Sequence, residues 1–395
     1  MQHLLKMVQK KSLFISTGAL LMLSLPTQAE MLNAYIGTYA PKGEGVYLTQ
    51  IDSQTGAMNK PTLAATITNG AQLVYNADQS VIYVASEINN YQGTTNGAIV
   101  AYSVAQNGTL TELNQVNSEG AGPVYLSIHP SGKFLLIANY ISGSIAVYPI
   151  NKDGSLEKAV SVKQSTGEPG LSYPKAAAPG SFALSDHDGP HAHMISSDPS
   201  GKFVFSTDLG LDRIYQWKFN TETGELTPNT PAFIMASSEG AGPRHFVFHP
   251  KANMMYLINE EASILTSYNF DKDKGTLTEK QSISILPVGY EGTSYASGII
   301  INETGTSLYT VNRLHNSISQ FAIDKNGEFS LVDNVWTRGD YTRTITFSPD
   351  GKFIYAMNQR SDNMVRFSVD AQTGKLTFVE NYVAVPAPSQ MIFAK

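Results

Sequence analysis

Residues 242–261 read GPRHFVFHPKANMMYLINEE. Two apolar runs, Phe246–Phe248 and Met254–Ile258, flank a short polar turn, and this pattern predicts a β-hairpin. Arg244 precedes the first run and Glu260 follows the second. Because the open ends of a hairpin lie side by side, we expect the arginine and the carboxylate to share one edge of a sheet.

Versions of this hairpin recur along the chain. Each has an apolar run, a turn that is often His/Asp/Ser-Pro-x-Gly, and a second run that ends near an Asn or an equivalent polar residue. The copies are Leu73–Ser86, Leu126–Tyr140, Met194–Asp208, Phe246–Asn259, Gly298–Asn312 and Ile345–Asn358. A repeat of about 50 residues is typical of β-propellers.

Further runs complete each repeat. A third alternating run, such as Ser144–Pro149, follows the hairpin, and a turn that ends in Gly-x-Leu leads to a fourth. Four antiparallel strands per repeat form a propeller blade. The N-terminal runs Leu32–Tyr39 and Gly45–Ile51 and the C-terminal run Ser389–Lys395 complete one more blade. We therefore predict an all-β, seven-bladed propeller whose N- and C-terminal strands close the ring in one blade; an open β-solenoid is the alternative.

Composition narrows the function. The 395 residues are 42% hydrophobic and 15% charged, carry a formal charge of -6, and include no cysteine. Without a basic stripe we expect no nucleic-acid partner. The lack of cysteine excludes thiolate catalysis and Cys-ligated zinc. No linker divides residues 30–395, so we expect a single domain there, and no apolar run reaches the roughly 20 residues of a membrane span.

Residues 1–29 resemble a secretory signal peptide. Three lysines precede the apolar segment Ser12–Leu25, and Thr27-Gln28-Ala29 suits a signal peptidase site near Ala29. This predicts a periplasmic or secreted protein. The alternative is a buried N-terminal helix.

Polar residues gather at the hairpin ends, and the first strand of each propeller blade faces the central channel. We therefore expect these residues to converge near the axis: His191, His193, Asp208, Arg244, His245, Glu260, Arg313 and Arg343. The His-x-His spacing on a strand places two rings on one side, which suits acid–base chemistry or a metal. Hydrogen bonding to a neighbouring blade is the structural alternative.

The arginines and Glu260 also admit two readings. Arg244 and Arg313 could bind an anion or stabilise an oxyanion, or they could form salt bridges between blades. Glu260 could be a base or the counter-ion of the arginines. Alternation along the strands predicts that His245 points to the face opposite Arg244, and that Glu261 points away from the cleft.

Two long connections stand out. Residues 164–190, rich in Ser, Pro, Gly and Ala, end directly in His191-Ala192-His193, so we expect this loop to overhang the histidine pair. A shorter excursion, Pro287–Tyr295, enters the fifth hairpin in a similar way.

Several motifs together resemble the 6-phosphogluconolactonase family of seven-bladed propellers, which includes the carboxy-cis,cis-muconate cyclases. They are Gly-Pro-His-Ala-His (189–193), Asp-Leu-Gly-Leu-Asp-Arg (208–213), Gly-Pro-Arg-His-x-x-Phe-His-Pro (242–250), Asn-Glu (259–260), Asn-Arg-x-His-Asn-Ser-Ile (312–318) and Ser-Pro-Asp-Gly-Lys-Phe (348–353). The resemblance spans essentially all of residues 30–395. It implies a central cleft with His193, Arg244, Glu260 and Arg313 as catalytic residues and with no metal or other cofactor.

We further expect the substrate to contact residues near these four: His191, His245, Arg343, Tyr125 and Asp208. Two positions depart from the family pattern. Tyr125 stands where the family often has histidine, and Ser297-Gly298 replaces a carboxylate.

These observations predict a hydrolase that opens a sugar-derived lactone, with a small-molecule lactone or an anionic sugar acid as its partner. One alternative is a non-catalytic exported propeller that binds a ligand or a protein. A weaker one is cycloisomerisation of a muconate-like diacid, since two arginines would suit two carboxylates. A closed ring can function as a monomer.

Overall fold

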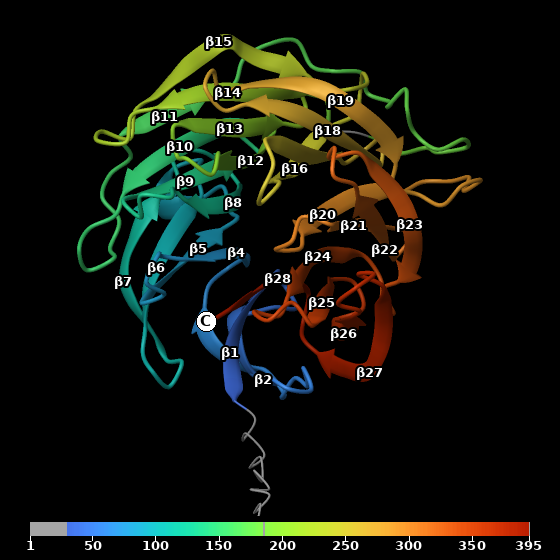
Figure 1. The fold of residues 1–395 in the computed structure, drawn as a ribbon. Coiled ribbons are helices and arrows are strands. Elements are labelled where there is room, and N and C mark those ends of the chain that lie inside the picture. Colours follow the sequence, from blue (N-terminus) through green and yellow to red (C-terminus); the bar gives the residue numbers. More distant parts are fainter. Residues whose placement is uncertain (1–29, 185, 395) are drawn as a thin grey trace, which may run out of the picture.

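The computed structural model describes residues 30–184 and 186–394, so the predicted signal peptide lies outside the described residues. These residues form seven four-stranded antiparallel sheets arranged around an axis, as Figure 1 shows. One short 3-10 helix, η1 (Tyr91–Gly93), follows β5. Within the described residues, no helix is long and apolar enough to cross a membrane.

The first three internal blades contain these strands, in order from the axis outward: β4 (Gly70–Tyr75), β5 (Val81–Ser86), β6 (Ala98–Val104) and β7 (Leu110–Asn117); β8 (Pro123–Ile128), β9 (Phe134–Asn139), β10 (Ser144–Pro149) and β11 (Ser161–Gln164); β12 (Ala192–Ser197), β13 (Phe203–Asp208), β14 (Arg213–Phe219) and β15 (Leu226–Met235).

The next three blades follow the same order: β16 (Pro243–Phe248), β17 (Met254–Asn259), β18 (Ile264–Asp271) and β19 (Thr276–Ser284); β20 (Tyr295–Ile301), β21 (Ser307–Arg313), β22 (Ser317–Ile323) and β23 (Phe329–Trp336); β24 (Thr342–Phe347), β25 (Phe353–Asn358), β26 (Asn363–Val369) and β27 (Leu376–Ala384).

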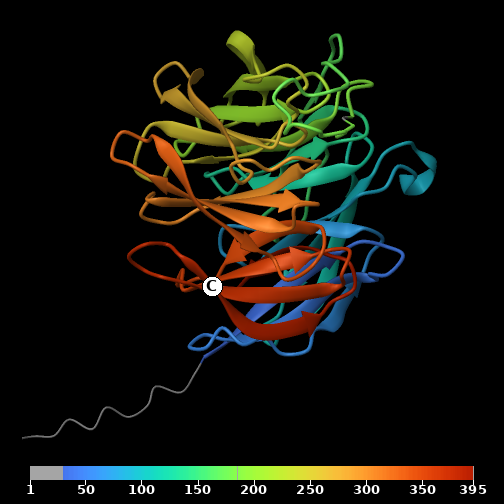
Figure 2. The ribbon, with the colours of Figure 1, turned by 90° about the vertical axis from the view of Figure 1, so that its right-hand side faces the viewer.

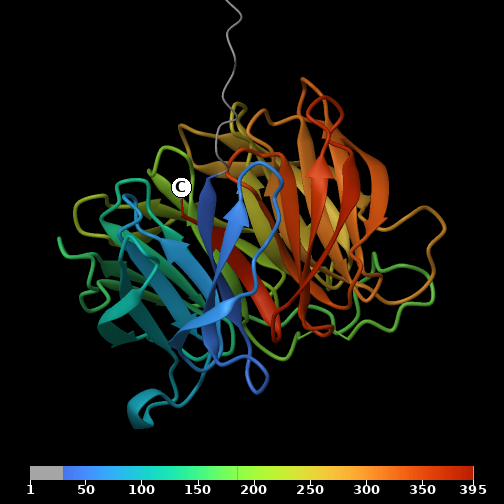
Figure 3. The ribbon, with the colours of Figure 1, turned by 90° about the horizontal axis from the view of Figure 1, so that it is seen from below.

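Both chain ends contribute to the seventh blade. Its strands are β28 (Pro388–Phe393), β1 (Met31–Thr38), β2 (Gly45–Asp52) and β3 (Thr62–Thr66), in that order. Figure 3 shows β28 beside β1, and β28 also contacts β4 and β24 in the adjoining blades. The predicted seven-bladed propeller, closed by terminal strands within one blade, is confirmed.

A repeated tyrosine joins neighbouring blades. Tyr83 on β5 is buried and donates its hydroxyl to the carbonyl of Gly154, 2.8 Å away in the next blade. Tyr256 and Tyr309 make the same bond to Gly327 and Gly374. Each of these glycines has a positive φ, which suits glycine in a tight turn. The tyrosine therefore fills the apolar space between sheets and satisfies its polar end in the next blade.

The inner strands share an irregularity that positions the site. Each of β4, β8, β12, β16 and β24 pairs with its neighbour through a bulge that leaves one residue unpaired near the start of the strand. The β20 and β28 pairings are irregular at the corresponding place. A bulge redirects the side chain that it carries and interrupts the alternation of faces.

The long connection 164–190 lies on the same side of the ring as η1, as Figure 2 shows. It crosses several blades: Gly170 N donates to Gly210 O, Gly292 N donates to Pro179 O, and Tyr295 Oη donates to Leu184 O. The two long connections expected from the sequence therefore contact each other.

Candidate active site

Two sets of repeat positions build a polar cluster at the axis. The first set is the bulge residues, where His193, Arg244 and Arg343 are the unpaired residues of β12, β16 and β24. The second set ends or directly follows the second strand of a blade and supplies Glu260 and Arg313. The bulges turn three side chains toward residues that neighbouring hairpins place at the same edge.

Glu260 binds two arginines from different blades. Its Oε2 accepts a hydrogen bond from Nε of Arg244 at 2.5 Å, and its Oε1 lies 2.5 Å from Nη2 of Arg313. Both guanidinium groups are almost fully buried, and Nη1 of Arg244 also donates to the carbonyl of Ser297. Charge-assisted bonds of this kind fix the planar guanidinium groups in place.

Glu260, Arg244 and Arg313 all keep their charged forms at neutral pH. Burial alone would raise the pKa of Glu260, but the charges of Arg313 and Arg244 outweigh it and hold that pKa below its usual value. Burial lowers the pKa of Arg244 to about 10, which still leaves it protonated at neutral pH. Glu260 is therefore an ionised counter-ion and only a weak base.

Arg343 is differently placed. Its Nη2 donates to Tyr39 Oη at 2.8 Å, and that hydroxyl donates to Oε2 of Glu87 at 2.6 Å. Among the described residues, no carboxylate lies within ion-pair distance of Arg343. Arg343 is close enough to Arg244 for its charge to lower the pKa of that guanidinium, so the cluster has an excess of positive charge.

Two imidazoles lie next to the arginines. The rings of His193 and His245 are 4.9 Å apart, and the ring of Tyr125 lies 5.0 Å from that of His245. Nη1 of Arg244 lies 3.1 Å from Nδ1 of His245. The prediction that His245 points away from Arg244 is wrong, because the bulge at Arg244 interrupts the alternation of the strand.

Both of these histidines are held neutral. Burial lowers the pKa of each well below its usual value, and the charges of Arg244 and Arg343 lower both further. Nδ1 of His193 is buried and has no hydrogen-bond partner among the described residues. A neutral ring beside cationic groups is a weak base, and it returns readily any proton that it accepts during a reaction.

His191 and Asp208 have other partners. Nδ1 of His191 lies 3.0 Å from the carbonyl oxygen of Tyr140, and its Nε2 lies 2.7 Å from Oδ1 of Asp188. Its ring stacks on that of Tyr140, which also packs edge-on against His193. Asp208 is fully buried and accepts bonds from the backbone N–H groups of His191 and Leu211. The carboxylate of Asp208 thus orders the backbone at His191 and Leu211.

Three consecutive loop residues anchor the long connection near the cluster. Asp186 accepts a hydrogen bond from Tyr140 Oη at 2.5 Å, and Asp188 binds His191. Between them, Nε2 of the buried His187 lies 3.2 Å from Oδ1 of Asp212. The loop expected to overhang the histidine pair is therefore fastened beside it.

Asp212 links this anchor to Arg244. Its carboxylate accepts hydrogen bonds from the backbone N–H groups of Gly240 at 2.6 Å and Gly242 at 2.9 Å. Gly242 has a φ of 69°, and a Cβ there would overlap Oε2 of the buried Glu261. Burial, reinforced by the charge of Glu260, raises the pKa of Glu261 well above its usual value. Asp212 thus orders the turn that leads into Arg244.

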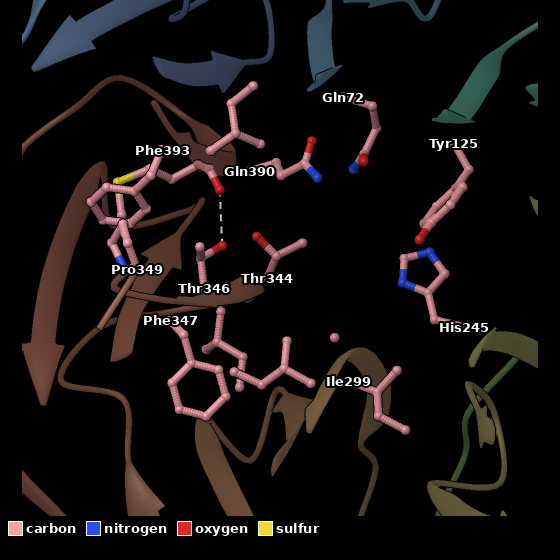
Figure 4. Close-up of a pocket in the computed structure, with 15 residues that line it drawn as sticks. Gln72, Tyr125, His245, Ile299, Thr344, Thr346, Phe347, Pro349, Gln390 and Phe393 are labelled. Carbon is pink, nitrogen blue, oxygen red and sulfur yellow. Dashed lines mark hydrogen bonds between the residues drawn. The ribbon is translucent and has the colours of Figure 1, made fainter. Parts of the chain in front are cut away.

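A pocket of about 390 Å3 has His245 and Tyr125 on one side, as Figure 4 shows. Gln72, Thr344 and Gln390 line the same pocket. The described residues contain no group of three or more His, Asp or Glu side chains arranged to hold a metal ion.

Sequence reasoning missed several members of the cluster. Tyr39, Glu87 and Tyr140 follow the second strands of their blades, at the same repeat position as Glu260. Aligning the repeats at the residue after the second strand would have found all three.

Known proteins share both the sequence and the fold. Residues 33–393 match the family model described as "Lactonase, 7-bladed beta-propeller". The 6-phosphogluconolactonase of Bacillus subtilis (strain 168) is 32% identical over 357 residues, which cover 90% of this chain and 96% of that protein. The 6-phosphogluconolactonase of Formosa agariphila is 28% identical, over 90% of this chain and 98% of that protein.

Among solved structures, the periplasmic gluconolactonase of Pseudomonas aeruginosa superposes with a TM-score of 0.83 and 28% identity, over 93% of this chain and 99% of that one. The propeller architecture and the sequence similarity extend over nearly the same residues. This chain belongs to the lactonase family of seven-bladed β-propellers.

Proposed function

We propose that this chain hydrolyses a sugar-derived lactone at the axial cluster, with His193, Arg244, Glu260 and Arg313 as the catalytic residues. The observation that carries the proposal is a neutral, buried His193 next to a cluster with excess positive charge. Relatives of this chain are named 6-phosphogluconolactonase and gluconolactonase, which supports the same reaction class.

Opening a lactone requires a base and an acid in turn. The oxygen of water adds to the carbonyl carbon and loses a proton; the ring C–O bond then breaks, and the ring oxygen gains a proton. His193 is the residue suited to carry that proton, because its ring is neutral and its Nδ1 is unpartnered among the described residues. Glu260 is less suited, because both of its oxygens bind guanidinium groups.

The arginines would stabilise the negative charge that develops on the carbonyl oxygen. Arg244 and Arg313 are fixed by Glu260 before substrate binds, and such preorganised donors lower the barrier because they need no reorientation. Arg343, which lacks a carboxylate partner among the described residues, is suited to hold the carboxylate of the product.

The pairing of Glu260 with Arg244 and Arg313 also helps to judge the cycloisomerase alternative. A muconate-like diacid requires cations for two carboxylates, whereas two of the three arginines already share the carboxylate of Glu260. Of these three, only Arg343 has no carboxylate partner within ion-pair distance among the described residues, so a second carboxylate would have to share a guanidinium group with Glu260; this is the observation that favours lactone hydrolysis.

A proton-release assay at constant pH tests the proposal. The substrates are D-glucono-1,5-lactone, its 6-phosphate, a simple aliphatic lactone and a muconate-type diacid, with heat-denatured protein as the blank for spontaneous opening. We expect release from at least one sugar lactone well above the blank. If no lactone is opened faster than the blank, the hydrolase proposal is wrong, and the non-catalytic binding function takes its place.

We also propose that residues 1–29 are removed on export to the periplasm or the medium. The apolar segment Ser12–Leu25 and the site at Ala29 support this, as does the description of a similar protein as periplasmic. N-terminal sequencing of the protein from cells should begin at Glu30. A chain that retains Met1 and stays in the cytoplasm would contradict export.

A further inference from the structure

We propose that the axial pocket is a subsite for the uncharged polyhydroxylated part of the substrate, so that the substrate class is an unphosphorylated aldonolactone. This inference rests on the proposed lactone hydrolysis, because it orients the same substrate. The reacting carbonyl lies at the arginine end, and the hydroxyl-bearing carbons extend down the axis.

Repeat geometry defines the pocket. The residues that directly follow the bulge positions form the next layer along the axis: Gln72, Tyr125, Met194, His245, Gly298, Thr344 and Gln390. All of them except Met194 line the pocket. Its volume of about 390 Å3 lies in the range of small-ligand sites, roughly 300–1,000 Å3.

Hydrogen-bonding groups remain available on several sides of this layer. Gln390 uses its Oε1 to accept from the N–H of Leu73 at 2.7 Å, which leaves its Nε2 as a donor. Thr344 Oγ1 donates to the Ser389 carbonyl at 2.6 Å and can still accept. In Figure 4, Gln390 lies across the pocket from Tyr125 and His245, and Gln72 lies between Gln390 and Tyr125. Sugar hydroxyls, which both donate and accept, match such an arrangement.

The layer is uncharged. No Lys, Arg, Asp or Glu is among the residues that line the pocket. Burial raises the pKa of Tyr125 to about 12, so its phenol is neutral, and His245 is held neutral as well. A phosphate at the far end of the substrate would lose its hydration without gaining a cation, which is strongly unfavourable. Neutral hydroxyl groups cost much less to bury, and hydrogen bonds to the side chains of this layer can offset that cost.

His245 connects the two parts of the site. Its ring lies against Arg244 and also lines the pocket. A lactone whose carbonyl lies near the arginines therefore extends past His245 toward Gln72 and Gln390. The aliphatic side chains of Ile299 and Met391 complete the wall and suit the C–H faces of a sugar.

The first test measures kcat and KM for D-glucono-1,5-lactone and for its 6-phosphate. We expect the wild type to have a kcat/KM at least tenfold higher for the unphosphorylated lactone. Gln72→Met should raise KM for that lactone about tenfold with kcat changed less than threefold. Gln115→Met, on the exposed outer strand β7, is the matched control and should change neither. A wild type that prefers the 6-phosphate, or a Gln72→Met variant with unchanged KM, would overturn the subsite while leaving lactone hydrolysis intact.

A second test introduces a charge into the pocket and measures the binding and the preference for the two lactones. Gln390→Glu retains the acceptor for Leu73 N–H but adds a negative charge, and it should weaken binding of the lactone. Gln72→Arg should shift the preference toward the 6-phosphate.

If the wild type opens no lactone, binding of 1,5-anhydro-D-glucitol, followed by NMR, tests the subsite separately. Binding that Gln72→Met abolishes supports the subsite, and absence of binding overturns it.

Discussion

Oε2 of Glu260 lies 2.5 Å from Nε of Arg244, and these two residues stand at the open ends of one hairpin. The same carboxylate binds Arg313 through its other oxygen. One hairpin thus supplies both an arginine and the counter-ion that joins it to the next blade. This arrangement fixes two guanidinium groups in a buried site before any ligand arrives.

Replacing Arg244 tests its role in stabilising the transition state. Arg244→Ala should lower kcat/KM for the preferred lactone on the order of a hundredfold, as removal of one preorganised oxyanion donor does. Arg338→Ala, at the start of the outer β23–β24 connection, serves as control and should stay within twofold of wild type. Unchanged turnover in Arg244→Ala would remove this residue from the mechanism.

Glu260 should matter for stability as well as for activity. Glu260→Gln removes the negative charge between two buried guanidinium groups, and breaking a buried ion pair in this way costs about 3–5 kcal/mol. Urea unfolding of the variant and the wild type measures the difference in the free energy of unfolding. A loss below about 1 kcal/mol would show that the arginines do not depend on this carboxylate.

The neutral histidines predict a loss of stability in acid. The folded-state pKa values of His193 and His245 lie well below 6.5, whereas the unfolded chain titrates near that value. Above pH 6.5 both states are neutral and the groups contribute nothing. Below it only the unfolded state gains protons, so the free energy of unfolding should fall by up to about 2.7 kcal/mol per pH unit for the two groups.

Urea unfolding at pH 7.5, 6.5 and 5.5 measures this slope, and the double variant His193→Gln/His245→Gln should flatten it. The acidic limb of kcat/KM should likewise lie well below pH 6.5, because a base with a lowered pKa stays unprotonated there. An acidic limb centred at pH 6.5 would mean that the working base has an ordinary pKa.

Asp212 is predicted to position Arg244. Asp212→Asn leaves one oxygen for the N–H groups of Gly240 and Gly242 and for His187, so the turn before Arg244 should loosen. We expect kcat to fall about tenfold, since small misplacements of catalytic groups are costly, with a smaller change in KM.

The matched control is Asp198→Asn, another buried aspartate that accepts turn N–H groups, from Ser200 and Phe203, at the other end of its hairpin. If both variants lose stability equally and neither changes kcat, then Asp212 is only structural.

The sequence predicted the blades well because each depends on local signals. Apolar alternation, polar turns that are often Pro-x-Gly, and the repeat length together define the hairpins, and these agree with the observed strands. The orientation of His245 could not be predicted from alternation, because a single unpaired residue, Arg244, interrupts it. Bulges arise from the pairing of two strands, and nothing in one strand alone specifies them.

Only part of the polar cluster at the axis was predicted, because charge was used to find its members and position in the repeat was not. Glu260 and Arg313 were found because they are charged residues at a hairpin end, whereas Tyr140 at the equivalent position resembles an ordinary aromatic residue. Asp208 attracted attention by its charge, yet it occupies the repeat position of the buried Asn259, where a side chain orders the backbone. Position in the repeat therefore predicts membership of the polar cluster better than residue type does.

The most direct measurement is the rate of D-glucono-1,5-lactone opening by the wild type and by His193→Gln, in variants shown to have the same melting temperature. We expect the wild type to open the lactone well above the spontaneous rate and His193→Gln to lose a hundredfold or more in kcat/KM, the usual contribution of a general acid–base. Equal rates for the two proteins would contradict this role of His193.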